Sequence, residues 1–213
     1  MTKCIICGGN TQTYSHPKFD MLFHECGNCE FIFKDEKNHL SSKEELAIYN
    51  LHENVEENIG YVNFLTNFVD SAVVPFVQKG KALDFGSGPN PVLAHILKHQ
   101  YRFDTMVYDL FYASDQGYLD HKFDLITSTE VVEHLKDPMK HFKIFHQLLN
   151  PQGVLSVMTL FHPKNRQQFF DWFYIRDPSH LSFFTPKTMI TIADLLDFKL
   201  IDTNAYRYVV FQK

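Results

Sequence analysis

Four cysteines, all within the first thirty residues, are the side chains best suited to bind a metal ion. They form two Cys-x-x-Cys pairs, Cys4 with Cys7 and Cys26 with Cys29, and eighteen residues separate the pairs. This spacing is typical of a tetrahedral zinc site with four thiolate ligands. We therefore predict a structural zinc ribbon over residues 1–36, closed to catalysis because the thiolates fill every position. Two disulfides, or a redox-active pair, are the alternative.

The composition is that of a globular protein. Of the 213 residues, 45% are hydrophobic and 21% are charged, which excludes a disordered tail, a collagen-like repeat and a disulfide miniprotein. The formal net charge of −5 argues against a broad phosphate-binding surface. No stretch approaches the ~20 apolar residues that cross a bilayer, and no secretory h-region is present. We expect a soluble, cytoplasmic protein without a membrane partner, whose oligomeric state the sequence does not fix.

After the cysteines, the sequence pattern is first helical and then alternates between strands and helices. Ser41 stands three residues before Glu44 in a capping-box pattern, which predicts the start of a helix. A second helix is predicted over residues 61–78, and Pro75 should kink or shorten it. From residue 81 onward, short apolar runs alternate with helical patterns, which predicts a parallel sheet with crossover helices. The expected division is a ribbon over 1–36, a helical lead-in segment over 37–80 and an α/β domain over 81–213.

The elements of the α/β domain can be placed individually. Strands are predicted at 82–85, 105–108, 123–128 and 154–159, and helices at 92–99, 138–149 and 186–196. Two final strands, 198–203 and 206–212, have only Asn204 and Ala205 between them, which predicts an antiparallel hairpin.

A glycine turn follows the first of these strands. From Leu83 the sequence reads LDFGSGPNP, a strand followed by a turn and a helix start. A dinucleotide pyrophosphate needs free backbone N–H groups at such a helix start. Here Pro89 and Pro91 carry no N–H, and Asn90 stands where the third glycine of the dinucleotide pattern would be. The turn therefore favours a ligand with an amino-acid end over one with a pyrophosphate.

A carboxylate follows the second strand at the same edge. Asp109 lies 21 residues beyond Gly88, where a carboxylate can accept hydrogen bonds from both ribose hydroxyls of an adenosine group. Open α/β sheets bind ligands beyond the carboxyl ends of their strands. Gly86, Gly88, Asp109 and the segment 128–130 all map to that edge. Individually, such residues also serve as turn glycines and helix caps.

Four segments together resemble a known family. LDFGSGP, YDLF, FDLITSTEVVEHL and LLNPQGVLSVMT look like successive motifs of the class I S-adenosylmethionine-dependent methyltransferases. The resemblance covers the chain from about residue 61 to its end. It implies a Rossmann-like seven-stranded sheet whose last strand is antiparallel, and S-adenosylmethionine as the cofactor. The implied cofactor contacts are Tyr61, Asp84, Gly86, Ser87, Gly88, Asp109, Leu110, Ser128, Thr129 and Glu130.

The chain departs from the family pattern in one place. Only thirteen residues separate Asp109 from Phe123, where family members commonly have a helix and a third strand. The usual aspartate beside the adenine amino group is therefore hard to place. Asp115 and Asp120 are the candidates.

Two nucleic-acid chemistries are disfavoured by the residues. Methylation of base amino groups often uses an Asn/Asp-Pro-Pro-aromatic tetrapeptide after the fourth strand, but Thr-Glu-Val-Val stands at 129–132. Methylation of pyrimidine C5 usually needs a cysteine nucleophile, and the four thiols are assigned to zinc.

The segment 169–184 follows the predicted strand at 154–159, where the family commonly covers the acceptor pocket. It combines aromatic rings with Arg176, Asp177 and His180, as a mostly apolar pocket with a few polar groups would. His180 is the candidate general base, because its unperturbed pKa of ~6.5 suits proton uptake near neutrality. Alternatively, His180 bonds Asp177 and only fixes the loop. His134 is expected to cap or pack.

We therefore predict a zinc-ribbon-bearing methyltransferase that uses S-adenosylmethionine on a small-molecule acceptor, at oxygen or carbon. One alternative is an RNA methyltransferase whose ribbon docks nucleic acid, with Lys34, Lys37 and Lys43 just beyond the ribbon. Another is a non-catalytic module that keeps the cofactor fold and binds a protein partner.

Overall fold

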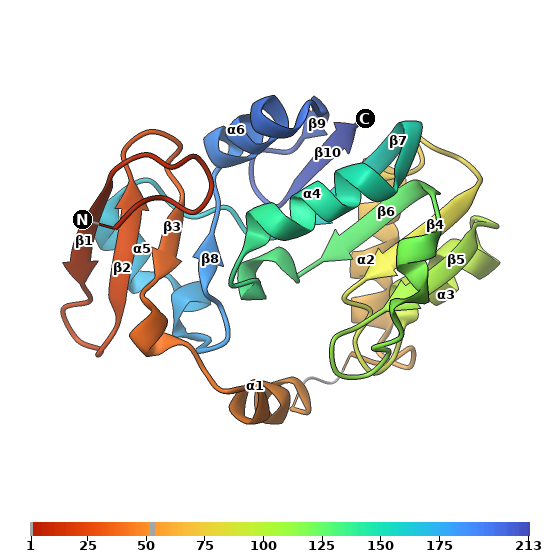
Figure 1. Ribbon diagram of the computed structural model, residues 1–213. Coiled ribbons are helices and arrows are strands. Elements are labelled where there is room, and N and C mark those ends of the chain that lie inside the picture. Colours follow the sequence, from red (N-terminus) through yellow and green to blue (C-terminus); the bar gives the residue numbers. More distant parts are fainter. Residues whose placement is uncertain (1, 52–53) are drawn as a thin grey trace.

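The chain forms two sheets that lie side by side (Figure 1). The structure is a computed structural model that describes residues 2–51 and 54–213. The larger sheet has six strands in the order β5-β4-β6-β7-β10-β9. The bounds are β4 Lys81–Phe85, β5 Asp104–Tyr108, β6 Phe123–Thr129, β7 Leu149–Met158, β9 Lys199–Thr203 and β10 Tyr208–Gln212. Strands β5, β4, β6 and β7 are parallel, whereas β10 runs antiparallel to both β7 and β9.

Helices cover both faces of this sheet, because successive residues of each strand point to opposite faces. Ala82 and Leu125 contact one apolar cluster with α2 (Ile59–Ala72) and α3 (Val92–His99). Their neighbours Leu83 and Ile126 contact a second cluster with α4 (Pro138–Leu148) and α6 (Pro186–Leu196). The result is a three-layer α/β arrangement with an antiparallel C-terminal hairpin, as the sequence predicted.

The expected count of seven strands is wrong for the described residues, which form six in this sheet. The thirteen residues between Asp109 and Phe123 form a loop and the short 3-10 helix η2 (Gln116–Asp120). They are too few for a crossover helix and a strand, which together need about a dozen residues or more. Strand β5 is therefore an edge strand.

The turn of the C-terminal hairpin is also longer than predicted. It spans residues 204–207 rather than two residues. The Asn204 side-chain oxygen accepts hydrogen bonds from the backbone N–H groups of Tyr206, Arg207 and Tyr208. This Asx-type cap substitutes for a two-residue turn, and Ala205 takes the left-handed conformation with φ +55°.

The smaller sheet has the order β1-β2-β3-β8. Its strands are β1 Thr11–Ser15, β2 Leu22–Cys26, β3 Ile32–Lys34 and β8 Ser182–Phe183. Strand β8 comes from the segment after β7, which also contains α5 (Arg166–Asp171) and η4 (Phe173–Arg176). Phe23 is fully buried against Phe169 and Phe183 in a shared apolar cluster. The N-terminal residues thus share an apolar core with the C-terminal half of the chain.

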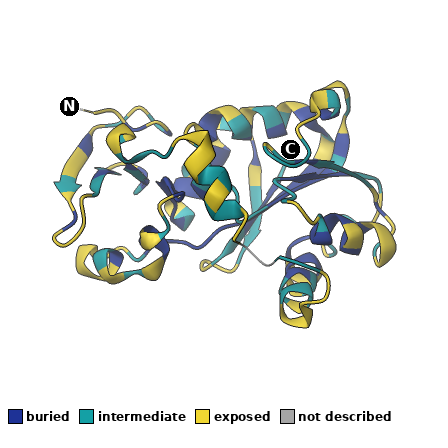
Figure 2. Cartoon of the chain, turned by 90° about the horizontal axis from the view of Figure 1, so that it is seen from below, coloured by how far each residue is buried: buried dark blue, intermediate teal, exposed yellow. Residues whose placement is uncertain are grey.

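The segment between the two sheets is helical. After η1 (Glu36–Asn38), α1 (Ser42–Tyr49) begins with the predicted capping box between Ser41 and Glu44. Helix α1 has no buried residue, and seen from below it lies exposed across the molecule (Figure 2). Helix α2 ends at Ala72, before Pro75, so the proline shortens the predicted helix. Within the described ranges, no helix combines the length and the apolar character that crossing a membrane requires.

Candidate active site

The turn after β4 lies at the carboxyl edge of the main sheet. The backbone N–H groups of Gly86 and Ser87 donate to the Tyr108 carbonyl oxygen at 2.7 and 3.1 Å. Gly86 has φ +85°, and a Cβ there would lie 2.2 Å from Cγ2 of Val131. Glycine is therefore required both by the backbone and by the neighbouring chain. Gly88 has φ +68°, but a Cβ there would meet nothing within 4 Å, so open space adjoins the turn.

Asp109 connects this turn to the loop after β5. Its Oδ2 accepts a hydrogen bond of 2.9 Å from the Gly88 N–H, and its Oδ1 accepts bonds of 2.9 and 3.1 Å from the N–H groups of Phe111 and Tyr112. An ionised carboxylate has about four lone-pair sites, so capacity remains for the hydroxyls of a ligand. The next residue, Leu110, is 61% exposed.

Asp84 is a buried carboxylate within β4. The Thr127 hydroxyl donates to its Oδ1 at 3.1 Å, and the residue is 2% exposed. Burial raises the pKa of Asp84 to about 7. Burial also raises the pKa of Tyr61 to about 12, helped by the negative charges of Asp84 and Glu130.

Two glutamates after β6 share one tyrosine. The Tyr174 hydroxyl lies 3.1 Å from Oε2 of Glu130 and also forms a short contact with Oε1 of Glu133. Glu133 lies in η3 (Val132–His134) and is fully buried. Burial, and secondarily the charge of Glu130, raises the pKa of Glu133 to about 8. The other oxygens, Oε1 of Glu130 and Oε2 of Glu133, are buried and have no hydrogen-bond partner in the described structure.

Two histidines lie beside these glutamates. The Nδ1 of His134 bonds the Ser179 carbonyl oxygen at 3.1 Å, and the Nδ1 of His180 bonds the Tyr174 carbonyl oxygen at 2.8 Å. The two imidazole rings are 4.7 Å apart. The Nε2 of His180 lies 3.8 Å from Oδ2 of Asp177, which is beyond hydrogen-bond distance but suits an ion pair when the imidazole is protonated.

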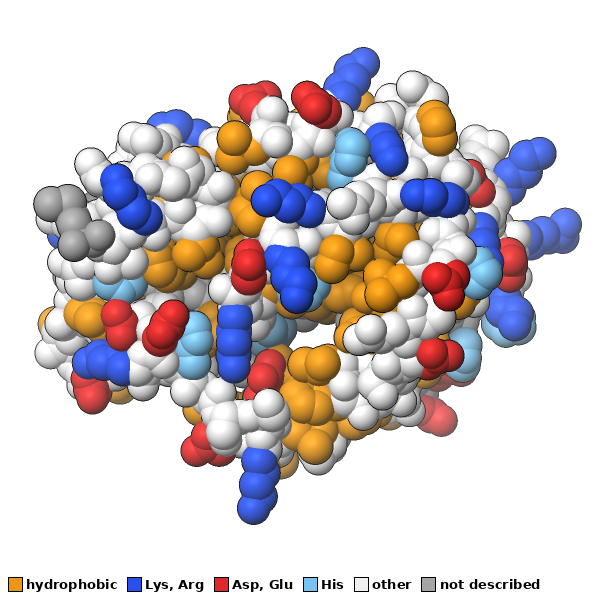
Figure 3. Space-filling view, in the orientation of Figure 1, with side chains coloured by type: hydrophobic (Ala, Val, Ile, Leu, Met, Phe, Trp, Pro, Cys, Tyr) orange, Lys and Arg blue, Asp and Glu red, His pale blue; other side chains and the backbone are white. Residues whose placement is uncertain are grey.

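Figure 3 shows a hollow between the N-terminal sheet and the main sheet, with hydrophobic, acidic and histidine side chains around it. Strands β4 and β6 point toward it with their carboxyl ends (Figure 1). Of the predicted contacts, Gly88 and Asp109 share a direct hydrogen bond, and Gly86 bonds the carbonyl oxygen of Tyr108, the residue before Asp109.

Residues 59–203, more than half of the chain, match a protein family described as "Methyltransferase domain". The chain belongs to this methyltransferase family. Among curated proteins, no sequence gives a significant match.

Solved structures of methyltransferases share the fold. Human N-acetylserotonin methyltransferase in complex with SAM is 14% identical, with a TM-score of 0.56 over 81% of this chain and 56% of the human chain. A SAM-dependent methyltransferase from Archaeoglobus fulgidus is also 14% identical, with a TM-score of 0.55 over 71% of this chain and 94% of that chain. At these identities the likeness shows the fold.

The N-terminal sheet of the methyltransferase is tied to the two-glutamate cluster by one residue. The Leu181 carbonyl oxygen accepts a bond of 2.8 Å from the Lys34 N–H in β3, and the Leu181 N–H donates to the Glu133 carbonyl oxygen at 2.7 Å. Leu181 directly follows His180. The segment that carries the candidate base is therefore held between the N-terminal sheet and η3.

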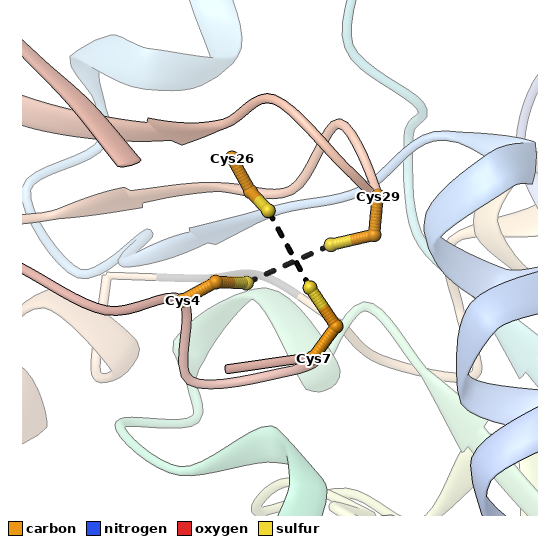
Figure 4. Close-up of side chains that lie close together, drawn as sticks. All are labelled: Cys4, Cys7, Cys26 and Cys29. Carbon is orange, nitrogen blue, oxygen red and sulfur yellow. Dashed lines mark hydrogen bonds between the residues drawn. The ribbon is translucent and has the colours of Figure 1, made fainter. Parts of the chain in front are cut away.

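The four cysteines of the methyltransferase converge on one point (Figure 4). The Sγ atoms of Cys4 and Cys29 are 3.6 Å apart, and those of Cys7 and Cys26 are 3.5 Å apart. All four sulfurs lie within 4.8 Å of one another. A disulfide needs ~2.05 Å between sulfurs, whereas a tetrahedral site with metal–sulfur bonds of ~2.3 Å has edges of about 3.8 Å. The sulfur positions therefore fit a tetrahedral metal ion.

The two knuckles use the same turn. The residue after each second cysteine, Gly8 or Glu30, has φ of +70° or +63°. Its N–H donates to the carbonyl oxygen of the first cysteine of the pair, Cys4 or Cys26, at 2.9 and 3.1 Å. Gly8 adopts this left-handed conformation without a Cβ, whereas Glu30 adopts it with a side chain.

The lysines expected to serve RNA are engaged elsewhere. Lys34 is 2% exposed, and its Nζ donates to the Asp177 carbonyl oxygen at 2.8 Å. Lys37 pairs with Asp20 at 3.0 Å. Only Lys43, of the three, is exposed without a bond in the described contacts. Of the three, Lys34 is therefore buried inside the protein and is not available to contact a nucleic acid.

The prediction missed two members of the site, Glu133 and Tyr174. A signal for Glu133 was present, because its spacing of three residues from Glu130 allows both carboxylates to share one side of a helical turn. Tyr174 carried no comparable signal, since it is one ring among several in an aromatic segment. Its contact with Glu133 spans 41 residues of sequence.

Proposed function

We propose that this methyltransferase binds S-adenosylmethionine at the carboxyl edge of the main sheet and methylates an oxygen or carbon atom of a small molecule. The observation that carries the proposal is the bond between Asp109 and Gly88, which joins a ribose-binding carboxylate to the glycine turn. The human relative is bound to SAM and the relative from Archaeoglobus fulgidus is SAM-dependent, which supports the choice of cofactor. The resemblance of the sequence motifs to those of class I methyltransferases supports the same cofactor.

The residues fit the two ends of this cofactor. The open space at Gly88 admits a ligand against the backbone of the turn, and Asp109 accepts hydrogen bonds from ribose hydroxyls. When bound, S-adenosylmethionine supplies a methyl group activated by a positively charged sulfur.

Methylation of a hydroxyl group requires removal of its proton. The acceptor oxygen forms a bond to the methyl carbon as the carbon–sulfur bond breaks, and the sulfur keeps the electron pair and becomes neutral. His180 is the proposed proton acceptor, since its Nδ1 donates to the Tyr174 carbonyl and its Nε2 then carries the lone pair. Alignment of the reacting atoms in a site of this kind can contribute ~7–11 kcal/mol.

We also propose a structural zinc ion on Cys4, Cys7, Cys26 and Cys29. The support is the tetrahedral arrangement of the four sulfurs. An ion bound by four thiolates has no position left for a substrate. Its role is therefore to fix the N-terminal sheet, on which the His180 segment rests through β8.

Calorimetry with S-adenosylhomocysteine on the zinc-loaded full chain tests the cofactor site. Asp109→Asn keeps the size of the side chain but removes one carboxylate oxygen, so we expect its affinity to fall about tenfold or more, as for loss of a charged hydrogen bond. Asp104→Asn, at the opposite end of the same strand, is the matched control and should bind like the wild type. A wild-type chain that does not bind at millimolar ligand would overturn the proposal.

A further inference from the structure

A second group of metal-ligating side chains lies at the acceptor end of the site. One ligand atom from each of Glu133, His134 and His180 lies within 4.8 Å of the others. They come from two segments far apart in the sequence, which the bond from the Leu181 N–H to the Glu133 carbonyl holds together. We propose that these three side chains, with Glu130 beside them, bind a divalent transition-metal ion.

The histidines are oriented as metal ligands usually are. A carbonyl oxygen can only accept, so the Nδ1 atoms of His134 and His180 must carry the protons in their bonds to Ser179 and Tyr174. This tautomer places the lone pair of each ring on Nε2. Metal-bound histidines in proteins almost always have their other ring nitrogen held in this way by a carbonyl or a carboxylate.

The two glutamates, Glu130 and Glu133, give a second reason to propose a metal ion here. Glu133 is fully buried, and its Oε2 has no hydrogen-bond partner in the described structure. The same holds for Oε1 of Glu130, while Tyr174 contacts the second oxygen of each carboxylate. Buried carboxylate oxygens without partners are costly, and buried carboxylates commonly pair or coordinate metals. A cation would satisfy both oxygens.

The ligand types select the ion. Two imidazoles with a carboxylate suit Mn²⁺, Fe²⁺, Co²⁺ or Zn²⁺, whereas Mg²⁺ and Ca²⁺ prefer sites built from oxygen atoms. Two histidines and a carboxylate on one side of an ion leave other positions open. An acceptor with a hydroxyl group, or two neighbouring oxygen atoms, could occupy these positions.

In the proposed function, His180 accepts the proton of the hydroxyl group that is methylated. A bound ion would promote loss of that proton instead of His180, and this catalytic role of the ion rests on the proposed function. A bound cation lowers the pKa of a coordinated hydroxyl group. The proton then passes to water, the oxygen attacks the methyl carbon, and the sulfur leaves as a neutral thioether. Binding of the ion itself does not depend on the methyl donor. The competing explanation is a protonated His180 that pairs with Asp177 and needs no metal.

A titration with Mn²⁺, followed by electron paramagnetic resonance of the free ion, separates these explanations. The full chain first receives one equivalent of Zn²⁺, which the four thiolates take up in preference to imidazole and carboxylate ligands, so that the second site stays open to Mn²⁺. We expect one additional Mn²⁺ per chain. Glu133→Gln and His180→Gln should each weaken Mn²⁺ binding about tenfold or more, at least as much as loss of a residue that only orients a ligand. His141→Gln, on α4 outside the cluster, is the control and should bind like the wild type.

The result that overturns the inference is a wild-type chain that binds no Mn²⁺ at millimolar concentration, or one whose binding Glu133→Gln and His180→Gln leave unchanged. Unfolding midpoints show whether the variants fold. Because Glu133 is fully buried, the half-buried His134→Gln replaces it if that variant unfolds. Calorimetry with S-adenosylhomocysteine runs in parallel. Binding of the nucleoside without Mn²⁺ refutes the ion site alone, and the expected Mn²⁺ pattern without nucleoside binding refutes the proposed function alone.

Discussion

Replacement of Gly86 by alanine tests whether the turn after β4 is shaped as described. Two separate effects should destabilise Gly86→Ala. The φ of +85° is unfavourable for any residue with a Cβ, and the new methyl group would lie 2.2 Å from Cγ2 of Val131. Gly88→Ala is the matched control, because Gly88 has φ +68° but a Cβ there meets nothing within 4 Å.

The two effects have different magnitudes. A left-handed conformation costs about 1–2 kcal/mol for a residue other than glycine, and both variants should lose this amount. Overpacking costs a further ~1–3 kcal/mol, and only Gly86→Ala should lose it. We therefore expect the free energy of unfolding to fall by about 2–5 kcal/mol for Gly86→Ala and by about 1–2 kcal/mol for Gly88→Ala.

Urea denaturation without ligand measures both values, and a double-mutant cycle isolates the steric part. Val131→Ala shortens the side chain that the new methyl group would meet. The cycle between Gly86→Ala and Val131→Ala should therefore give a favourable coupling of about 1–3 kcal/mol. Equal losses for Gly86→Ala and Gly88→Ala, with no coupling to Val131, would show that the turn does not pack on the segment after β6.

Three further predictions concern buried charge and zinc. Burial raises the folded-state pKa of Asp84 to about 7, compared with ~3.9 in an unfolded chain. The free energy of unfolding of the wild type, relative to that of Asp84→Asn, should therefore fall by about 4 kcal/mol as the pH rises from ~4 to ~8. Urea denaturation at each pH measures this difference. Unfolding free energies of the two proteins that change with pH by the same amount would contradict the prediction. Burial lowers the folded-state pKa of Lys34 to about 8, below ~10.4 in an unfolded chain, so the wild type should gain about 3 kcal/mol relative to Lys34→Met between pH ~8 and ~10.5. The same denaturation assay measures this gain, and a loss would refute the burial of the amine. Chelation of zinc should lower the melting temperature and the turnover, because the ribbon loses its metal. The affinity for S-adenosylhomocysteine should stay within about twofold, since the proposed cofactor edge is formed by β4 and β5. A loss of affinity as large as the loss of turnover would show that the ribbon supports the cofactor site as well as the acceptor site.

The parts of the fold that the sequence predicted are those fixed by local rules. The capping box between Ser41 and Glu44 formed as expected, since its two hydrogen bonds involve residues three apart. The helices at 92–99 and 186–196 have the predicted bounds. The carboxyl edge followed from topology, because the ends of parallel strands must meet at one edge. The seventh strand, which only the family resemblance predicted, is absent from the described sheet. The connection after Asp109 is too short to form it.

The parts that escaped prediction depend on contacts between distant segments. Strand β8 has two residues, and it exists because β3 offers an unpaired edge for it. The Tyr174 hydroxyl reaches Glu130 and Glu133 only once the segment after β7 has folded back over β6. No periodicity within 173–184 encodes either contact. The acceptor side of the site was therefore harder to predict than the cofactor side.

This difference has a consequence for how the two sheets work together. Gly88 and Asp109, which we propose to bind the cofactor, lie at the edge of the main sheet, whereas the segment that bears His180 is bonded to both the N-terminal sheet and η3. Lys34 of β3 bonds Leu181, Leu181 bonds Glu133, and the side chain of Lys34 bonds the Asp177 carbonyl. A shift of the N-terminal sheet would thus move His180 relative to Glu133 and leave Asp109 in place. We therefore expect that loss of the four cysteines, which hold that sheet in place, would change the geometry of methyl acceptance more than the binding of the methyl donor.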